Sequence, residues 1–352
     1  MSRLDDERTF RELDPGRMLE AVGGLASHCR EGYALGIGAE GLPSGEGVTA
    51  IAFCGMGGSA VSGDVLRTLY SDRLRVPVVV VRSPQLPEFV GPHTLVVASS
   101  YSGNTAETLA AFEEAVDRGA RVVPLTSGGE LARRAAELDL AAVTVPGGFM
   151  PRAAIGYLAM GCLGALEGIG LLPPVQAELD ESSSELERLS QQLAPGVPTS
   201  INPAKQLAEA IGERVPVIWG AEGIGAVAAA RWKTQCNENG KVPAWAAALP
   251  ELDHNEVVGW SGDAGRRFFL VVLRHEGEHR DVAARFPHSV AIAEEADIRL
   301  QEVWASGRSA LARLFTLVMH GDFTATYLGV LRGVDPSPID AIERLKQALA
   351  EP

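Results

Sequence analysis

TAIAFCGMGGSAVSGDVL, residues 49–66, is the stretch on which the fold prediction rests. Its apolar run at 51–54 predicts a buried strand, and the glycines at 55, 57 and 58 predict a tight turn into a helix. Such a turn favours anion binding, because glycines let the backbone approach a ligand and the first helical turn presents N–H groups without internal partners. We therefore expect a strand, turn and helix with an anion site near Ser59.

A second strand–loop–helix unit follows, with hydroxyl side chains in its loop. The run TLVVASS, residues 94–100, leads into YSGNTAETL, residues 101–109. Ligands of parallel sheets lie beyond the carboxyl ends of the strands, so the two units would aim Ser59, Ser100, Ser102 and Thr105 at one crevice. Hydroxyls and backbone amides without Lys or Arg suit the terminal phosphate of a small molecule.

Each loop has an alternative interpretation. GMGGSA resembles a fragment of the dinucleotide fingerprint, but its last position is Ser59, and no acidic residue ends the second strand at 78–82, where a ribose hydroxyl would be bound. For the second loop the alternative is a helix cap by Asn104 and Thr105, with Glu107 three residues after Asn104.

Length and charge narrow the class of protein. The 352 residues suggest about two domains, and 46% hydrophobic with 22% charged residues is typical of a globular protein. The net charge of −14 argues against nucleic-acid and anionic-membrane surfaces, because a negative field repels polyanions. A small phosphorylated ligand needs only a local pocket and stays compatible with this charge.

Cysteines and the N-terminus indicate neither a secreted protein nor a metal site. The first 14 residues, MSRLDDERTFRELD, lack the apolar core of a signal peptide, and no run of about 18 apolar residues follows. We expect a soluble cytoplasmic protein without a disulfide framework or structural zinc. The four cysteines are far apart and form no CxxC pair: Cys29, Cys54, Cys162 and Cys236.

The alternation of strands and helices in the first half predicts a parallel, doubly wound sheet. Strands are expected at 51–54, 76–81, 95–99, 121–125 and 142–145, and helices after the first strand and at 106–118 and 130–137.

Four segments make up the predicted organisation. Residues 1–48 form an N-terminal helical arm with a helix at 14–30, and residues 49–172 form the first domain, which ends in an apolar helix at 153–172. The Pro173-Pro174 stop opens a helical linker, 173–202, and residues 203–352 form the second domain with a C-terminal helix.

The second domain repeats the first in outline. The run at 217–219 meets glycines at 220, 223 and 225, with later strands expected at 268–273 and 290–292. Its loop, AEGIGAVA, lacks the serines, so we expect this copy to keep the scaffold and to lack the phosphate site.

Charged residues at four places are candidates for chemistry. Glu238 sits between two asparagines at a predicted helix end with Gly240 as the C′ residue, and its apolar neighbours Trp232, Pro243 and Trp245 would raise its pKa by desolvation. His254 follows after a short connector.

Arg152 and Lys346 have both structural and functional interpretations. Arg152 opens the apolar helix at 153–172, either as a surface cation or as a charge held at the end of the crevice. Lys346 lies on the last amphipathic helix, whose periodicity favours a solvated lysine.

Taken together, the motifs MGGSA, SSYSGNTAET, PRAAIGYL, NENGKVPAW, LPELDHNE and IERLK resemble, in order and over almost the whole chain, the bifunctional phosphoglucose/phosphomannose isomerases of the sugar isomerase (SIS) domain superfamily. The loop motifs are shared by SIS proteins in general, whereas the NEN and HNE pair is typical of this branch. The resemblance implies two tandem SIS domains, each a flavodoxin-like three-layer α/β sandwich, with additional helices.

The resemblance also implies an activity and a site. The activity is the interconversion of fructose 6-phosphate with glucose 6-phosphate and mannose 6-phosphate, without metal or cofactor. Glu238 would move a proton between C1 and C2, and Arg152 would stabilise the enediolate. In a homodimer, His254 of the partner would serve ring opening with Lys346. The phosphate would be held by Gly58, Ser59, Ser100, Ser102 and Thr105.

A second hypothesis is a phosphosugar-binding SIS protein with a regulatory or scaffold role and no turnover. Such regulators keep the hydroxyl loop but do not need Arg152, Glu238 and His254 together. They often carry a DNA-binding segment, which this acidic chain lacks. A third hypothesis, a nicotinamide-dependent dehydrogenase, rests only on the glycine turn.

Overall fold

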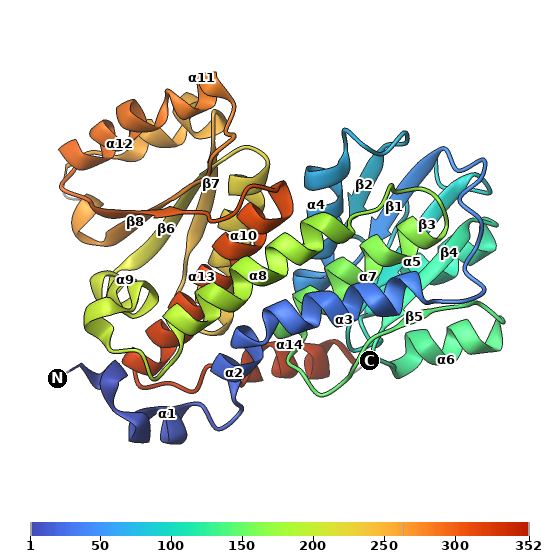
Figure 1. Ribbon diagram of the computed structural model, residues 1–352, viewed down its shortest axis with the longest axis horizontal. Helices are drawn as coiled ribbons and strands as arrows, with labels where there is room; N and C mark the ends of the chain where they lie inside the picture. The colour runs from blue at the N-terminus through green and yellow to red at the C-terminus, as the bar shows by residue number, and fades with distance from the viewer. Residues whose placement is uncertain (1, 263, 351–352) are drawn as a thin grey trace.

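Two parallel β-sheets, joined by a central layer of helices, make up the molecule (Figure 1). The structure is a computed structural model that describes residues 2–262 and 264–350. One sheet belongs to the first half of the described chain and the other to the second half. The predicted α/β class with two doubly wound parallel sheets and extra helices is therefore confirmed.

The first sheet has five strands in the order β2-β1-β3-β4-β5, and all its pairings are parallel. The strand order reverses between β1 and β3, which makes their carboxyl ends the switch point where ligands of such sheets bind. The strands are β1 (Ala50–Cys54), β2 (Val78–Val81), β3 (Thr94–Ser99), β4 (Arg121–Thr126) and β5 (Val143–Thr144).

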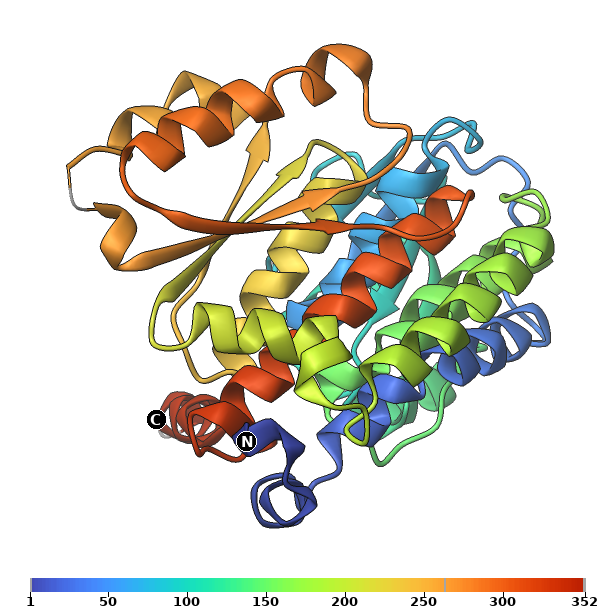
Figure 2. The ribbon, with the colours of Figure 1, turned by 60° about the vertical axis from the view of Figure 1, so that its left-hand side comes forward.

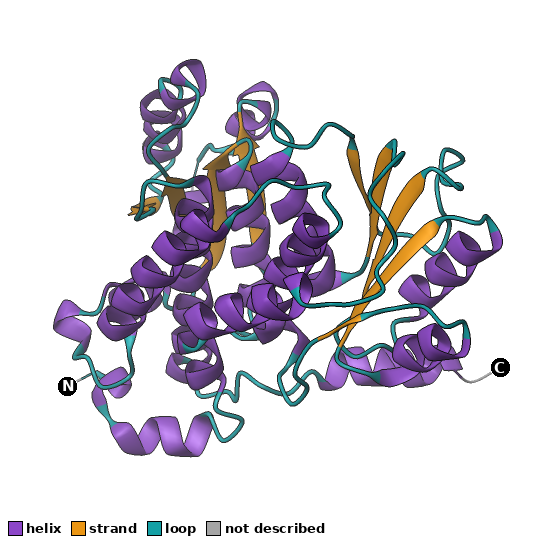
Figure 3. Cartoon of the chain, turned by 45° about the vertical axis from the view of Figure 1, so that its right-hand side comes forward, coloured by secondary structure: helices purple, strands orange, loops and turns teal. Residues whose placement is uncertain are grey.

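Helices cover both faces of this sheet, because alternate strand residues point to opposite sides. Ile51 and Phe53 pack with α4 (Gly57–Tyr70) and α7 (Ile155–Gly168), whereas Ala52 and Cys54 pack with α5 (Ala106–Asp117) and α6 (Gly129–Glu137). Figure 3 shows the resulting three layers. The predicted apolar helix begins two residues late, because the 3-10 turn η2 (Pro151–Ala154) precedes it.

The second sheet has four parallel strands in the order β7-β6-β8-β9. They are β6 (Val215–Ala221), β7 (Trp245–Leu249), β8 (Phe268–Arg274) and β9 (Arg299–Trp304). The strand predicted at 290–292 is wrong, because this segment lies in α12 (Phe286–Glu295). Phe286, Ser289 and Ala293 are buried at helical spacing, and the edge strand is β9.

Helices α10 (Ile224–Glu238) and α13 (Ala310–Leu331) cover one face of the second sheet. The other face is covered by α12, with α11 (Arg280–Ala283) before it, and by the 3-10 turns η4 (Glu251–His254) and η5 (Glu256–Gly259). A third 3-10 turn, η6 (Ala264–Arg266), precedes β8. Among the helices of the described residues, α13 is the one long and apolar enough to cross a membrane. Its apolar window is 94% buried, as in the core helix of a soluble protein.

The N-terminal segment and the connection between the halves are helical. The predicted helix at 14–30 is two helices, because Gly24 separates α2 (Met18–Gly23) from α3 (Leu25–Ile37). Helix α3 lies close to α7: a Cβ at Gly36 would be 2.1 Å from the Gly161 carbonyl oxygen. The other helical elements here are η1 (Arg3–Asp5), α1 (Glu7–Leu13), α8 (Gln176–Leu193), η3 (Thr199–Ile201) and α9 (Pro203–Ile211).

Helices α3, α8 and α13 lie side by side between the two sheets (Figure 2). Helix α14 (Asp340–Ala350) follows α13 and is exposed from 341 to 349. The division at residues 48, 172 and 202 stays a prediction.

Candidate active site

The two predicted loops meet at the switch point of the first sheet. Gly57 begins α4 with a positive φ of 50°, after the N-cap residue Met56. The Oγ of Ser59 accepts a hydrogen bond from the Tyr101 N–H at 3.3 Å. The β1–α4 turn is thereby joined to the β3–α5 loop.

The β3–α5 loop groups three hydroxyls. The Oγ of Ser100 and the Oγ1 of Thr105 are 2.9 Å apart, and the Oγ of Ser102 accepts the Asn104 N–H at 3.3 Å. Between them, Gly103 has φ of 70°, and a Cβ there would lie 1.8 Å from the Gly128 carbonyl oxygen. The loop conformation therefore requires glycine at this position.

Asn104 acts as a cap, although not for the helix that the sequence suggested. Its Oδ1 accepts the Glu130 N–H at 2.9 Å, in the first turn of α6. Thr105 is the N-cap residue of α5 but makes no side-chain cap bond. Its hydroxyl instead pairs with Ser100 in the loop.

Arg152 connects these loops to the second half of the chain. Its side chain is 3% exposed, which excludes a surface cation. A Cβ at Gly58 would lie 3.4 Å from the Arg152 Cα, an ordinary van der Waals distance, so α4 packs directly beside the Arg152 backbone. Burial lowers the pKa of Arg152, and the adjacent Glu238 carboxylate opposes this shift only in part.

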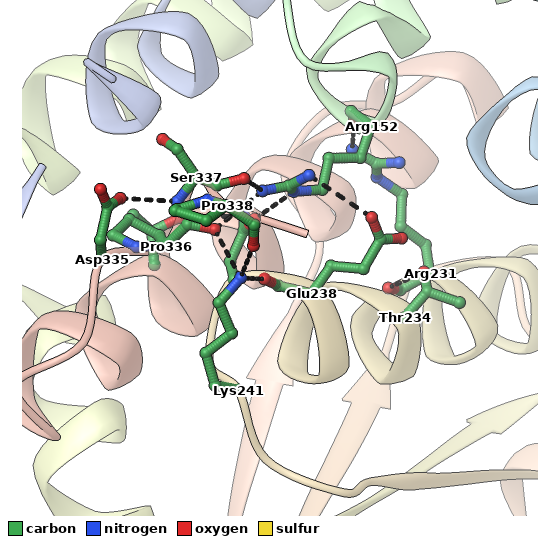
Figure 4. A network of polar contacts seen from close by, with 11 residues as sticks. Arg152, Arg231, Thr234, Glu238, Lys241, Asp335, Pro336, Ser337 and Pro338 are labelled. Carbon is green, nitrogen blue, oxygen red and sulfur yellow. Dashed lines mark hydrogen bonds and ion pairs between the residues drawn. The ribbon is translucent and has the colours of Figure 1, made fainter. Parts of the chain in front are cut away.

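The guanidinium of Arg152 has partners on two segments of the second half of the chain (Figure 4). Its Nη1 lies 3.4 Å from the Glu238 Oε2, and its Nε donates to the Asn239 Oδ1. Its Nη2 donates to the carbonyl oxygens of Pro336 and Ser337, each at 2.8 Å. The loop after α13 and the end of α10 therefore converge on one cation.

The end of α10 differs in detail from the prediction. Asn239 is the C-cap residue, and the left-handed residue is Lys241, with φ of 51°, not Gly240. Gly240 instead permits close packing, because a Cβ there would lie 2.7 Å from the Cys236 carbonyl oxygen. The Asn239 Nδ2 donates to Thr326 Oγ1 at 3.2 Å, which ties the α10 terminus to α13.

The apolar residues expected around Glu238 have other neighbours. Trp232 donates to the Leu317 carbonyl and stacks on His320, and Trp245 is 54% exposed on β7. Among the described residues, the polar contact of the Glu238 carboxylate is with Arg152.

A buried ion pair lies beneath the site and was missed from the sequence. Arg231 on α10 contacts Asp322 on α13 through two bonds of 2.6 and 3.1 Å, and it also donates to the Arg152 carbonyl at 2.7 Å. Burial raises the pKa of Asp322, and Arg231 counteracts this. Two features of the sequence could have indicated this pair. Arg231 precedes Glu238 by two helical turns, and Asp322 is an isolated charge in an apolar helix.

His254 and Lys346 are not brought to this cluster within one chain. Both side chains are exposed, and no hydrogen bond or ion pair in the described part of the chain joins either to Arg152 or Glu238. Because α10 runs antiparallel to β6, Glu238 lies at the amino-end edge of the second sheet. His254 follows β7 at the carboxyl-end edge, and the five residues of β7 alone span about 16 Å.

Two family models match the chain. The model described as bacterial phospho-glucose isomerase C-terminal SIS domain matches residues 200–349. The SIS domain model matches residues 48–151.

Curated relatives match over most of their lengths. A bifunctional phosphoglucose/phosphomannose isomerase of Caldicellulosiruptor bescii is 36% identical over 95% of this chain and 99% of its own. The protein of the same name from Aquifex aeolicus is 36% identical over 85% and 90%. A D-glucosamine-6-phosphate 4-epimerase of Sulfolobus acidocaldarius is 31% identical over 66% and 71%.

Solved structures share the fold. A glucose-6-phosphate isomerase like protein from Thermus thermophilus aligns with a TM-score of 0.64 at 23% identity, covering 99% of both chains. A hypothetical protein from the same organism aligns with a TM-score of 0.75 at 19% identity, over 98% of this chain and 94% of its own.

Proposed function

This chain belongs to the family of bifunctional phosphoglucose/phosphomannose isomerases, and we propose that it interconverts fructose 6-phosphate with glucose 6-phosphate and mannose 6-phosphate at the site between its two sheets. The observation that carries the proposal is the contact between Arg152 and Glu238. It joins a buried cation beside the hydroxyl loops to a carboxylate of the second half of the chain.

The hydroxyl loops would hold the phosphate of the sugar. They lie at the switch point of the first sheet, and α4 directs its N-terminal N–H groups and positive dipole end toward it. Five residues are proposed for this role: Gly58, Ser59, Ser100, Ser102 and Thr105. Phosphate held there directs the carbon chain toward Arg152, whose backbone adjoins Gly58.

Glu238 is the proposed base. In the forward direction its carboxylate takes the proton from C1 of the open-chain ketose, which gives a cis-enediolate with its charge on the C2 oxygen. The proton of the C1 hydroxyl passes to the C2 oxygen, and Glu238 then returns its proton to C2 as the C1 carbonyl forms. Return to one face of C2 gives the glucose configuration, and return to the other face gives the mannose configuration.

Arg152 would stabilise the negative charge on the enediolate oxygens. Its guanidinium is fixed by Asn239 and by two backbone carbonyls before any substrate arrives. A preorganised cation in a buried setting stabilises developing charge more than a solvated one does, because it needs no reorganisation.

His254 is proposed to act in the neighbouring site of a homodimer. Glu238 and His254 lie at opposite edges of the second sheet, so one chain cannot bring them together. The surface around His254 also suits an interface, since Val258 is 81% exposed close by in the sequence. There His254 would open the sugar ring together with Lys346, whose helix α14 is exposed from 341 to 349.

We further propose that the enzyme is cytoplasmic and needs neither metal nor cofactor. The test uses purified protein treated with a chelator, incubated with fructose 6-phosphate, with glucose 6-phosphate and mannose 6-phosphate followed separately. We expect both products. Formation of glucose 6-phosphate alone would show that the protein is not a mannose 6-phosphate isomerase.

A non-catalytic phosphosugar-binding protein is the alternative. If neither product forms in that assay while fructose 6-phosphate still raises the melting temperature, the alternative replaces the isomerase. The Arg152–Glu238 contact favours the isomerase, because a protein that only binds a phosphosugar does not need a base paired with a buried cation.

A further inference from the structure

We propose that Lys241 is a positioning residue of this site, which holds the turn at 336–338 and thereby fixes the Arg152 guanidinium opposite Glu238. The inference rests on the proposed function.

The backbone turns the Lys241 side chain back over the end of α10. Its φ of 51° is a left-handed conformation that is uncommon for residues other than glycine. The Nζ donates to the carbonyl oxygens of Glu238, of Pro336 at 3.0 Å, and of Pro338. An ammonium group has three N–H donors, so each has an acceptor.

Lys241 and Arg152 hold the same turn from two sides (Figure 4). The Pro336 carbonyl accepts from both cations, and the Ser337 carbonyl accepts from Arg152. Three successive carbonyls thus face two positive charges. The prolines at 336 and 338 carry no N–H and have a fixed φ, and the Asp335 carboxylate accepts the Ser337 N–H at 2.8 Å.

This arrangement makes the position of the guanidinium depend on Lys241. The Arg152–Glu238 distance of 3.4 Å is the longest of the four contacts of the guanidinium, so it is sensitive to a shift of the turn. Lys241 also binds the Glu238 backbone carbonyl, and so it contacts both the residue that carries the proposed base and the turn that holds the cation.

Electrostatics also link Lys241 to the site. Burial lowers the pKa of Lys241, and the nearby Arg152 lowers it further, whereas Glu238 and Asp335 raise it. Two cations in such proximity repel each other, and the three carbonyls and the carboxylates offset that repulsion. Removing the ammonium group leaves carbonyls without their donor, and the turn is then free to shift.

The test is Lys241→Met, which keeps the aliphatic chain and removes the donors. A misplaced guanidinium weakens a contact made to the enediolate, so we expect kcat for fructose 6-phosphate to fall about tenfold or more. KM should stay within about threefold, because the phosphate loops lie on other elements. Lys241→Arg should recover part of kcat, since a guanidinium can donate to the same carbonyls.

Lys205→Met is a matched control. The Lys205 ammonium is also buried and is also held by backbone carbonyls, those of Leu4 and Pro195, but it ties the N-terminal segment to α9. This variant should melt at a lower temperature and keep the wild-type kcat. The same outcome for Lys241→Met, a lower melting temperature with kcat within about twofold of wild type, would overturn the inference.

Two further measurements keep the outcomes distinct. If the Met variant does not fold, Lys241→Gly replaces it, because glycine preserves the left-handed backbone. The same fall in kcat with little change in KM is expected for this variant. The wild-type enzyme is assayed first, because its inactivity would refute the proposed function, whereas an active wild type with an equally active Lys241→Met would refute only the role of Lys241.

Discussion

Individual residues in this protein show how burial decides protonation. Arg152 is buried among carbonyls and beside a carboxylate, which suits a charge that must stay fixed. His320 has the opposite setting: it lies in α13, stacked on Trp232 of α10, and burial lowers its pKa to about 4. The folded protein therefore keeps this imidazole neutral where an unfolded chain would bind a proton.

The sign of the resulting pH dependence follows from proton binding. Below the ordinary histidine pKa of about 6.5, the unfolded state binds a proton at His320 and the folded state does not. The contribution of His320 to the free energy of unfolding is therefore fully present above pH 6.5, and it is lost as the pH falls toward 4. Over that window it amounts to about 3 kcal/mol.

Chemical denaturation between pH 7 and pH 4 checks this expectation. The difference in unfolding free energy between wild type and His320→Phe, which keeps the aromatic stack, should shift in favour of the variant as pH falls. A difference that stays constant across the window would show that His320 does not titrate in this way.

At the scale of secondary-structure elements, the phosphate loops depend on backbone conformation as much as on hydroxyl groups. Gly103 has a positive φ and no room for a side chain against Gly128, so the β3–α5 loop tolerates no Cβ without moving. The hydroxyls of Ser100, Ser102 and Thr105 are arranged by this loop.

Gly103→Ala should therefore raise KM for fructose 6-phosphate by about tenfold and lower the melting temperature, because an alanine is strained at positive φ. Gly91→Ala is the control, since a Cβ at Gly91 would meet nothing within 4 Å. Equal KM values for the two variants would contradict the role of the loop.

Local patterns in the sequence predicted the elements around the site, but not the contacts between them. The apolar run and glycines at 51–58 identified β1 and α4, because a buried parallel strand and a helix start both have local signals. The prediction of a strand at 290–292 was wrong because the β-branched residues there belong to α12, a helix with its own buried face.

The features that local patterns did not predict depend on contacts between residues far apart in the sequence. The alanine-rich β7 has no strand pattern and forms because it pairs with β6. The bond between Arg152 and Asn239 spans 87 residues, so no periodicity reports it. The roles of His254 and Lys346 were assigned from the resemblance of their motifs to the family, not from the spacing of residues. Those roles remain predictions.

At the scale of the whole molecule, the separation of Glu238 and His254 implies a shared site. One lies at the amino-end edge and the other beyond the carboxyl-end edge of the same sheet. If the site uses both, each site of a homodimer takes Glu238 from one subunit and His254 from the other. A variant at either position then damages both sites of its own dimer, yet a mixed dimer contains one intact site.

The most direct measurement is therefore fructose 6-phosphate isomerisation by Glu238→Gln, by His254→Ala, and by the two variants co-expressed. Glu238→Gln alone should bind the sugar phosphate without turning it over, and His254→Ala alone should be strongly impaired on the closed sugar. Random assembly makes half of the dimers mixed, so the co-expressed pair should recover about a quarter of wild-type activity. Wild-type turnover by Glu238→Gln, or a mixture no more active than its separate parts, would contradict a shared site with Glu238 as its base.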